Sequence, residues 1–283
     1  MSTPDLHALT AEPARLLVAL DFDGTLSPIV PDPAAAVAHP AVPPVLRRLA
    51  AGIGHLAIIT GRPAEIAVHR SEFDRIAADA AETGQPLAAN RLVVLGHYGA
   101  ERWDGATGQV DGMPEHDGVA EARAVVEGWL ADGSLAAGVR LEDKGRSFAV
   151  HTRRAADPSG AFAAALGMLE PLAAGLGLVL EPGRQVVELR PPGVDKGAAL
   201  RELVDLVGAG AVVYAGDDLG DLPAFAEVER LRSAGKPGLT LCAASEEASE
   251  VAEHADVVVA GPAGVASFLG ELADAAERAT RRS

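Results

Sequence analysis

Short apolar runs recur along this chain, with helical stretches between them. The runs cover residues 16–20, 55–59, 92–95, 211–215, 239–242 and 256–259. Strands that alternate with helices in this way pair into a parallel sheet that is covered by helices on both faces. The pattern therefore predicts an α/β protein with a Rossmann-like, doubly wound parallel sheet, and it predicts helices over residues 45–51 and 64–77.

The middle third of the chain has a different order of elements. It predicts a helix, two strands, a helix and two strands, over residues 119–130, 139–142, 147–151, 160–176, 178–181 and 186–189. The Pro182-Gly183 turn favours a hairpin between the last two strands. We expect a separate α+β unit of order αββαββ at residues 111–190, inserted into a core of residues 1–110 and 191–283. Stretches 103–118 and 191–193 are its expected connections.

Two carboxylates follow the first apolar run, in the sequence Asp21-Phe22-Asp23-Gly24-Thr25. In open parallel sheets, chemistry gathers at the carboxyl ends of the strands. Side chains at positions i and i+2 of a strand point the same way, so the two negative groups need a cation or a proton between them. Magnesium, a hard ion that prefers oxygen ligands, meets that need. A solvated turn that ends the strand explains the same residues equally well.

Polar residues at three other strand ends suit phosphoryl transfer. Thr60 offers a hydroxyl and a backbone N–H where a helix begins, although a plain N-cap has the same signature. Lys196 opens a helix against the helix dipole, which a nearby anion explains, but a solvated lysine is common there. Asp217, Asp218 and Asp221 follow an apolar strand. A helix N-terminus accounts for one or two of these acids, and a bound cation accounts for all three.

Charge and cysteine content exclude several classes of protein. The formal charge is −16, from 24 basic and 40 acidic residues among 283, which argues against nucleic acid and anionic membranes as partners. The single cysteine, Cys242, excludes an internal disulfide framework and a cysteine-rich zinc site. Because no apolar run approaches the roughly 20 residues that span a bilayer, we expect a cytoplasmic protein. We also expect it to be a monomer.

Together, the four polar segments resemble the motifs of the haloacid dehalogenase superfamily of phosphohydrolases, in the same order along the chain. The resemblance implies that Asp21 attacks phosphorus and that Asp23 transfers the proton. It implies that Mg²⁺ is held by Asp21, the Asp23 carbonyl and Asp217, with Asp218 and Asp221 in supporting positions. It also implies that the phosphoryl group is held by Thr60 and Lys196, with further substrate contacts from Gly24, Thr25, Gly61 and Arg62. A surface role for Arg62 is an equally good interpretation. The inserted unit resembles the larger type of cap domain in this superfamily.

Other segments resemble trehalose-6-phosphate phosphatases. They are Gly96-His97-Tyr98-Gly99-Ala100-Glu101, the stretch 141–147 with His151 and Arg153 downstream, the stretch 181–191, and Gly216-Asp217-Asp218. The resemblance implies hydrolysis of trehalose 6-phosphate, with Glu142, Lys144 and Glu188 of the cap contacting the distal glucose. It also implies that the cap closes over the core about residues 191–193 and the loop near Gly112. His97 and His151 are expected to be structural.

One departure from the family pattern leaves the substrate open. Family members usually have Thr, Asp and Glu where this chain has Gly220, Asp221 and Leu222. The alternatives are a phosphatase for sucrose, mannosylglycerate or glucosylglycerate phosphate, or a catalytically silent phosphatase-like partner domain. The intact set of Asp21, Asp23, Thr60, Lys196 and Asp217 argues against the silent domain. A receiver-like signalling domain needs about half this length and has no place for the insert.

Overall fold

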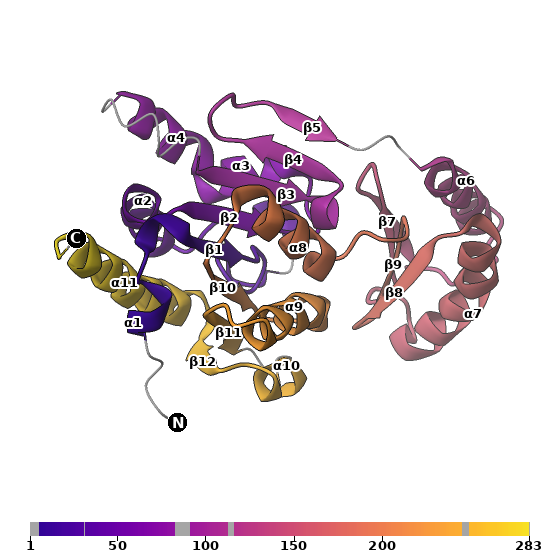
Figure 1. Cartoon of the computed structure of the whole chain (residues 1–283). Coiled ribbons are helices and arrows are strands. Elements are labelled where there is room, and N and C mark those ends of the chain that lie inside the picture. Colours follow the sequence, from indigo (N-terminus) through magenta and orange to yellow (C-terminus); the bar gives the residue numbers. More distant parts are fainter. Residues whose placement is uncertain (1–5, 31, 83–90, 113–115, 245–248, 283) are drawn as a thin grey trace. The chain divides into compact units, whose positions relative to one another are not determined.

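The computed structural model describes residues 6–30, 32–82, 91–112, 116–244 and 249–282 (Figure 1). Two compact units divide the chain, one formed by Met1–Gly112 with Asp195–Ser283 and the other by Met113–Val194. The first carries an eight-stranded sheet and the second a four-stranded sheet. The predicted α/β fold with an inserted αββαββ unit is confirmed.

The sheet of the larger unit has the strand order β12-β11-β10-β1-β2-β3-β4-β5. Its strands are β1 Leu16–Leu20, β2 His55–Ile59, β3 Leu92–Gly96, β4 Glu101–Asp104, β5 Val110–Gly112, β10 Ala211–Gly216, β11 Gly238–Ala244 and β12 Val257–Ala260. The strands from β12 to β3 run parallel, and β4 and β5 are antiparallel additions at one edge. β1 lies between β10 and β2, with Val18 opposite Val213 and Leu56.

Helices cover both faces of this sheet. They are α1 Leu6–Leu9, α2 Val42–Gly52, α3 Ala64–Ser71, α4 Phe73–Glu82, α8 Lys196–Val207, α9 Leu222–Ser233, α10 Ser249–Glu253 and α11 Gly261–Thr280. Val18 of β1 faces a core shared with α2 and α11, and Ala19 faces a second core shared with α8 and α9. All five residues of β1 are buried, as expected for a central parallel strand with helices on both sides.

The smaller unit packs two helices on one face of an antiparallel sheet of order β6-β7-β9-β8. Its elements are α6 Asp117–Ala131, β6 Arg140–Asp143, β7 Phe148–His151, α7 Pro158–Leu176, β8 Val179–Gly183 and β9 Val186–Arg190. Phe148 and Val150 of β7, paired with Leu189 and Val187 of β9, bury their side chains with Leu169 of α7. The unit therefore has a hydrophobic core of its own.

Helix α7 corrects the expectation that no apolar run of this chain approaches the length that spans a bilayer. It is the one helix in the described part of the chain that is long and apolar enough to cross a membrane by length and composition, with 19 residues and a mean hydropathy of 1.3. Ala161, Ala165, Leu169 and Ala173 on its inner face lie in the core of the smaller unit.

Two elements of the larger unit differ from the sequence expectation. The helix predicted over 64–77 is two helices, α3 and α4, because Glu72 between them is left-handed (φ 62°). The stretch predicted as a connection, 103–118, contains the second half of β4 and all of β5. Its residues 113–115 lie outside the described residues.

Candidate active site

Asp21 and Asp217 lie side by side at the carboxyl ends of neighbouring strands. Asp21 follows β1, and its N–H donates to the carbonyl of Ala215 in β10 at 2.8 Å. Both carboxylates are 4% exposed. One oxygen each from Asp21, Asp217 and Asp221 lies within 4.8 Å of the others, so the three could hold a metal ion. The structure thus brings Asp21 and Asp217, from two neighbouring strand ends, close to Asp221.

Lys196 is buried among these acids. It is the first residue of α8, where the Asp195 side chain caps the helix by accepting from the N–H of Ala198 at 2.8 Å. The Lys196 Nζ lies 2.9 Å from Asp21 Oδ1 and 2.7 Å from Asp221 Oδ1. Burial acts to lower the pKa of Lys196, but these two carboxylates outweigh it and hold the pKa well above the ordinary value. Lys196 is therefore a fixed positive charge.

Asp221 is the most heavily bonded acid of the cluster. Its Oδ1 accepts from Lys196 Nζ and from the Tyr214 hydroxyl, both at 2.7 Å. Its Oδ2 accepts from the backbone N–H groups of Asp217 at 2.9 Å and Asp218 at 3.1 Å. Burial acts to raise the pKa of Asp221, but Lys196 and these hydrogen bonds lower it overall. Because four donors fill the usual acceptor sites of a carboxylate, Asp221 holds Lys196, Tyr214 and the loop after β10 in place.

The pKa values of Asp21 and Asp217 are shifted in the opposite direction. Burial, then the charges of Asp218 and Asp221, raises the pKa of Asp217 to about 8. Burial also raises the pKa of Asp21 well above the ordinary value, although Lys196 opposes the shift. Two buried carboxylates with one lysine hold excess negative charge, which a divalent cation with oxygen ligands relieves. The chemistry of this donor set therefore fits a divalent metal.

Gly24 and Thr25, which follow Asp23 in the chain, lie against Asp217 of this cluster. Gly24 has a left-handed backbone (φ +79°), and a Cβ there would lie 1.9 Å from Asp217 Oδ2. Only glycine allows the loop to approach that acid so closely. The Thr25 hydroxyl, fully buried, donates to Asp217 Oδ1 at 3.3 Å. Both residues thus contact a candidate metal ligand, and a contact with substrate stays a prediction.

Asp23 is bound by Arg62. The Arg62 Nε and Nη2 atoms donate to the two Asp23 oxygens at 2.6 and 2.7 Å. Arg62 Nη2 also donates to the Pro33 carbonyl at 2.9 Å, and the guanidinium lies 5.5 Å from the Phe22 ring centroid. The Asp23 side chain remains 44% exposed. Arg62, which is predicted to contact phosphate, is therefore bound to Asp23, the predicted proton donor.

Thr60 and Asp218 complete the predicted core residues. Thr60 is buried, and its Oγ1 accepts from the N–H of Arg62 at 3.2 Å, beside Gly61. The Asp218 side chain is 66% exposed, and its Oδ1 lies 3.9 Å from Lys196 Nζ. Asp218 thus sits at the exposed rim of the cluster.

The predicted sugar contacts form a second group, in the smaller unit. Glu188 of β9 accepts from Lys144 Nζ at 2.7 Å and from the Ser147 hydroxyl at 2.8 Å. Glu142 of β6 lies 2.7 Å from His151 Nε2. Glu142 and Glu188 both stand opposite Ala149 of β7, so they share one face of the sheet. Lys144 follows directly after β6.

Several residues were not predicted from the sequence as part of these groups. Tyr214 supports Asp221, and Ser147 supports Glu188. The signal for Tyr214 was a hydroxyl in a strand whose other residues are apolar or glycine, because a buried tyrosine usually finds a partner for its hydroxyl. His97 is buried, and His151 pairs with Glu142.

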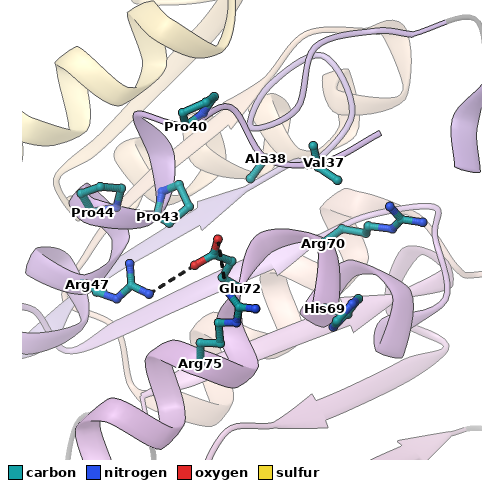
Figure 2. A pocket seen from close by; sticks show the side chains of 10 residues that line it. All are labelled: Val37, Ala38, Pro40, Pro43, Pro44, Arg47, His69, Arg70, Glu72 and Arg75. Atoms are coloured by element: carbon teal, nitrogen blue, oxygen red, sulfur yellow. Dashed lines mark hydrogen bonds and ion pairs between the residues drawn. The ribbon is translucent and has the colours of Figure 1, made fainter. Parts of the chain in front are cut away.

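A surface pocket of about 460 Å³ lies elsewhere on the larger unit, between residues 37–44 and the junction of α3 and α4 (Figure 2). Arg47, Arg70 and Arg75 line it with Glu72, and Arg47 lies 3.2 Å from the Glu72 carboxylate. The residues that line it include none of the predicted site residues.

The parallel sheet with its inserted antiparallel unit has the fold of a haloacid dehalogenase-like hydrolase of Bacteroides thetaiotaomicron, which matches with a TM-score of 0.55 at 18% identity, over 90% of this chain and 98% of the other. More specifically, the chain belongs to the trehalose-phosphatase family, whose sequence profile matches residues 19–259.

Two curated proteins illustrate what the chain is similar to. The chain is 33% identical over 273 residues to a trehalose-phosphate phosphatase of Mycobacterium marinum, which covers 92% of this chain and 62% of the relative. The chain thus spans less than two thirds of that protein. It is also 34% identical over 239 residues to an uncharacterized glycosyl hydrolase of Mycobacterium tuberculosis, covering 78% of this chain and 16% of the relative.

Among solved structures, the C-terminal domain of C. albicans trehalose-6-phosphate phosphatase matches with a TM-score of 0.72 at 20% identity, over 95% of each chain. A trehalose-6-phosphate phosphatase related protein matches with a TM-score of 0.67 at 22% identity, over 93% of this chain and 99% of the other. At these identities the structures establish the fold.

Proposed function

We propose that this chain is a magnesium-dependent phosphatase that hydrolyses trehalose 6-phosphate to trehalose and phosphate, the last step of trehalose synthesis. The observation that carries the proposal is the buried cluster of Asp21, Lys196 and Asp217 at the carboxyl ends of β1 and β10, in a member of the trehalose-phosphatase family.

In the proposed mechanism, Asp21 Oδ2 attacks phosphorus. The other oxygen, Oδ1, is held by Lys196, which fixes the carboxylate for an in-line approach. An aspartyl phosphate forms as the bond between phosphorus and the sugar oxygen breaks, and Asp23 donates the proton to that oxygen. Asp23 then takes a proton from water, which attacks phosphorus, releases phosphate and restores Asp21.

Asp21, Asp217 and the backbone carbonyl of Asp23 are the proposed holders of Mg²⁺. When bound, magnesium neutralises negative charge on the transferring phosphoryl group. Asp221 keeps Lys196 and the Asp217 backbone in place through its four hydrogen bonds. Asp218 supports the same site from its rim.

Lys196 and Thr60 are the proposed ligands of the phosphoryl oxygens, with Gly24, Thr25 and Gly61 lining the approach. Arg62 has two candidate partners, because its guanidinium suits a phosphate as well as it suits the Asp23 carboxylate. We propose that it holds Asp23 in the resting protein and contacts phosphate with substrate present.

We propose that the sugar is recognised by Glu142, Lys144 and Glu188. A cluster of carboxylates and one lysine recognises phosphate and metal, so discrimination among sugars needs other donors and acceptors. We propose residues 111–190 as a cap on a core of residues 1–110 and 191–283, closing about residues 191–193 and Gly112 to exclude water.

The proposed partners are a small sugar phosphate and Mg²⁺ alone, for a monomer in the cytoplasm. The charge of −16 supports this, because an acidic surface repels nucleic acid and anionic lipid. It also means that an anionic substrate depends on a few local cations such as Lys196.

A panel of sugar phosphates, assayed for phosphate release with and without Mg²⁺, tests the proposal. Trehalose 6-phosphate should be hydrolysed fastest, and chelation should abolish release. Sucrose, mannosylglycerate and glucosylglycerate phosphates belong in the panel, because Gly220 and Leu222 depart from the usual pattern of the family. Strong release from one of these esters without release from trehalose 6-phosphate would refute the substrate and leave the mechanism. Absence of release from every ester would support the silent partner domain.

A further inference from the structure

The turn that joins β3 to β4 lies directly against the loop that carries Thr60. The N–H of Tyr98 donates to the Thr60 carbonyl at 2.9 Å, and the N–H of His97 donates to the Arg62 carbonyl at 2.9 Å. The N–H of Thr60 donates in turn to the Leu95 carbonyl at 3.0 Å. Three backbone hydrogen bonds therefore fix the position of the Thr60 loop relative to the end of β3 and the turn after it.

This turn has an unusual backbone. His97 (φ 48°), Tyr98 (φ 59°) and Gly99 (φ +105°) are consecutive residues with positive φ. Left-handed conformations are unfavourable for residues with a Cβ, and a structure keeps them where surrounding contacts over-determine the backbone. Here the conformation aims two successive N–H groups, those of His97 and Tyr98, at carbonyls of the Thr60 loop.

Glu101, at the start of β4, reaches the helix that follows the loop. Helix α3 begins at Ala64 after Pro63, whose side chain cannot accept a hydrogen bond. Glu101 Oε2 instead accepts from the N–H of Ala64 at 3.0 Å. A carboxylate at a helix N-terminus also interacts favourably with the helix dipole. Glu101 therefore serves as a helix cap supplied from a neighbouring strand.

Two glycines allow these segments to touch. A Cβ on Gly61 would lie 2.6 Å from the Tyr98 hydroxyl oxygen, and a Cβ on Gly99 would lie 2.9 Å from the Ala199 Cβ. Ala199 lies on α8, three residues after Lys196. The same turn therefore packs against both the Thr60 loop and the helix that carries Lys196.

We propose that Tyr98 and Glu101 are positioning residues for phosphate binding. They set the Thr60 loop and the Lys196 helix relative to each other, so that both phosphate ligands converge on one point. The inference rests on the proposed function of Thr60 and Lys196, and it assigns a task to the segment Gly96–Glu101, which the mechanism leaves unused.

Calorimetric titration with inorganic phosphate in the presence of Mg²⁺ tests the proposal without relying on turnover. Glu101→Ala should raise the dissociation constant for phosphate about fivefold to tenfold, because α3 loses its charged cap and the loop loosens. Glu101→Gln should restore most of the affinity, because the amide oxygen still accepts from the N–H of Ala64. Affinity for Mg²⁺ alone should stay within about twofold, because the metal ligands belong to other loops.

A second variant separates positioning from stability. Tyr98→Gly adopts the left-handed backbone without strain, so folding is retained, but the contact with Gly61 is lost. Its phosphate dissociation constant should also rise by about fivefold. Asp157→Ala is the matched control, because it removes the N-cap of α7, where Asp157 accepts from the N–H of Gly160 at 3.0 Å. It should lower the melting temperature and leave phosphate binding unchanged.

The possible outcomes are distinct. Unchanged phosphate affinity in folded Glu101→Ala and Tyr98→Gly would refute the positioning role, and so would a parallel loss of Mg²⁺ affinity. If the parent protein binds phosphate and these variants bind it equally well, the proposed function stands and this inference fails. If the parent protein binds no phosphate, both fail.

Discussion

At the scale of single residues, Asp221 decides how the acidic cluster is arranged. Lys196 and the Tyr214 hydroxyl bond to one of its oxygens, and two backbone N–H groups bond to the other. All of these groups donate, so only a carboxylate satisfies them together. Asp221 is thus the residue through which the lysine on α8 and the loop after β10 are joined.

Asp221→Asn tests this arrangement. One end of the asparagine amide is an NH₂ group, which cannot accept hydrogen bonds, so one pair of donors loses its acceptor. We therefore expect the free energy of unfolding to fall by about 2–4 kcal/mol. Asp218→Asn is the matched control, because that side chain is 66% exposed and asparagine caps a turn as well as aspartate does. Denaturant unfolding measures both, and equal changes in the two variants would contradict the argument.

The raised pKa of Asp217 predicts how stability depends on pH. Its pKa is about 8 in the folded chain against an ordinary value of 3.8, so the folded state binds this proton more tightly than the unfolded state. That stabilisation is complete below the ordinary value and is lost as pH rises towards the folded value. With a chelator present, the melting temperature should therefore fall between pH 6 and pH 8.

Mg²⁺ should reduce this fall, because the cation replaces the proton as the partner of Asp217. Asp217→Asn lacks the titrating group, so its melting temperature should depend less on pH in that interval. Thermal unfolding at several pH values, with Mg²⁺ and with chelator, measures the effect. Identical pH dependence in the two conditions would show that the metal does not bind at Asp217.

At the scale of elements, a helix cap sets the position of Lys196. Asp195→Ala removes the acceptor for the N–H of Ala198, which should lower the free energy of unfolding by about 1 kcal/mol. Because Lys196 is the next residue, turnover of an aryl phosphate should fall by about threefold to tenfold. Asp195→Asn should retain both properties. An Asp195→Ala variant with full activity would show that the cap does not position the lysine.

The same scale shows what the sequence could predict. The apolar runs β1, β2 and β10 ended in polar residues, and that pattern was enough to place Asp21, Thr60 and Asp217 at strand ends. The β4–β5 hairpin was missed because its strands are short and polar, and its partner is the edge of β3. The break at Glu72 was missed because no glycine or proline marks it. Glu72 instead pairs with Arg47 on α2, a contact that local sequence does not encode.

The residues of the site were likewise predicted only in part from the sequence. Period and spacing predicted which acids share a strand end, because those rules are local. They did not predict Tyr214 beneath Asp221 or Ser147 beside Glu188, because these hydrogen bonds join residues on different elements or turns. The engagement of Arg62 with Asp23 likewise depends on how two loops meet.

At the scale of the whole molecule, the chain has two units with separate cores, and each unit carries one of the two groups of predicted site residues. The larger unit holds the carboxylates and Lys196, which suit phosphate and metal. The smaller unit holds Glu142, Lys144 and Glu188 on one face of its sheet, which suit hydroxyl groups. We therefore expect chemistry and sugar discrimination to be separable by mutation.

Lys144→Ala tests that separation. It removes the cation that donates to Glu188 at 2.7 Å, while Ser147 still donates to the other oxygen of Glu188. We expect kcat/KM for trehalose 6-phosphate to fall about tenfold or more, because the proposed charged donor to the substrate is lost. Turnover of p-nitrophenyl phosphate, which has no sugar to recognise, should stay within about twofold.

Arg123→Ala is the control, because it breaks the ion pair with Asp143 in the same unit. It should leave both substrates unaffected, and an equal loss on both substrates in Lys144→Ala would show that this unit does not recognise the sugar.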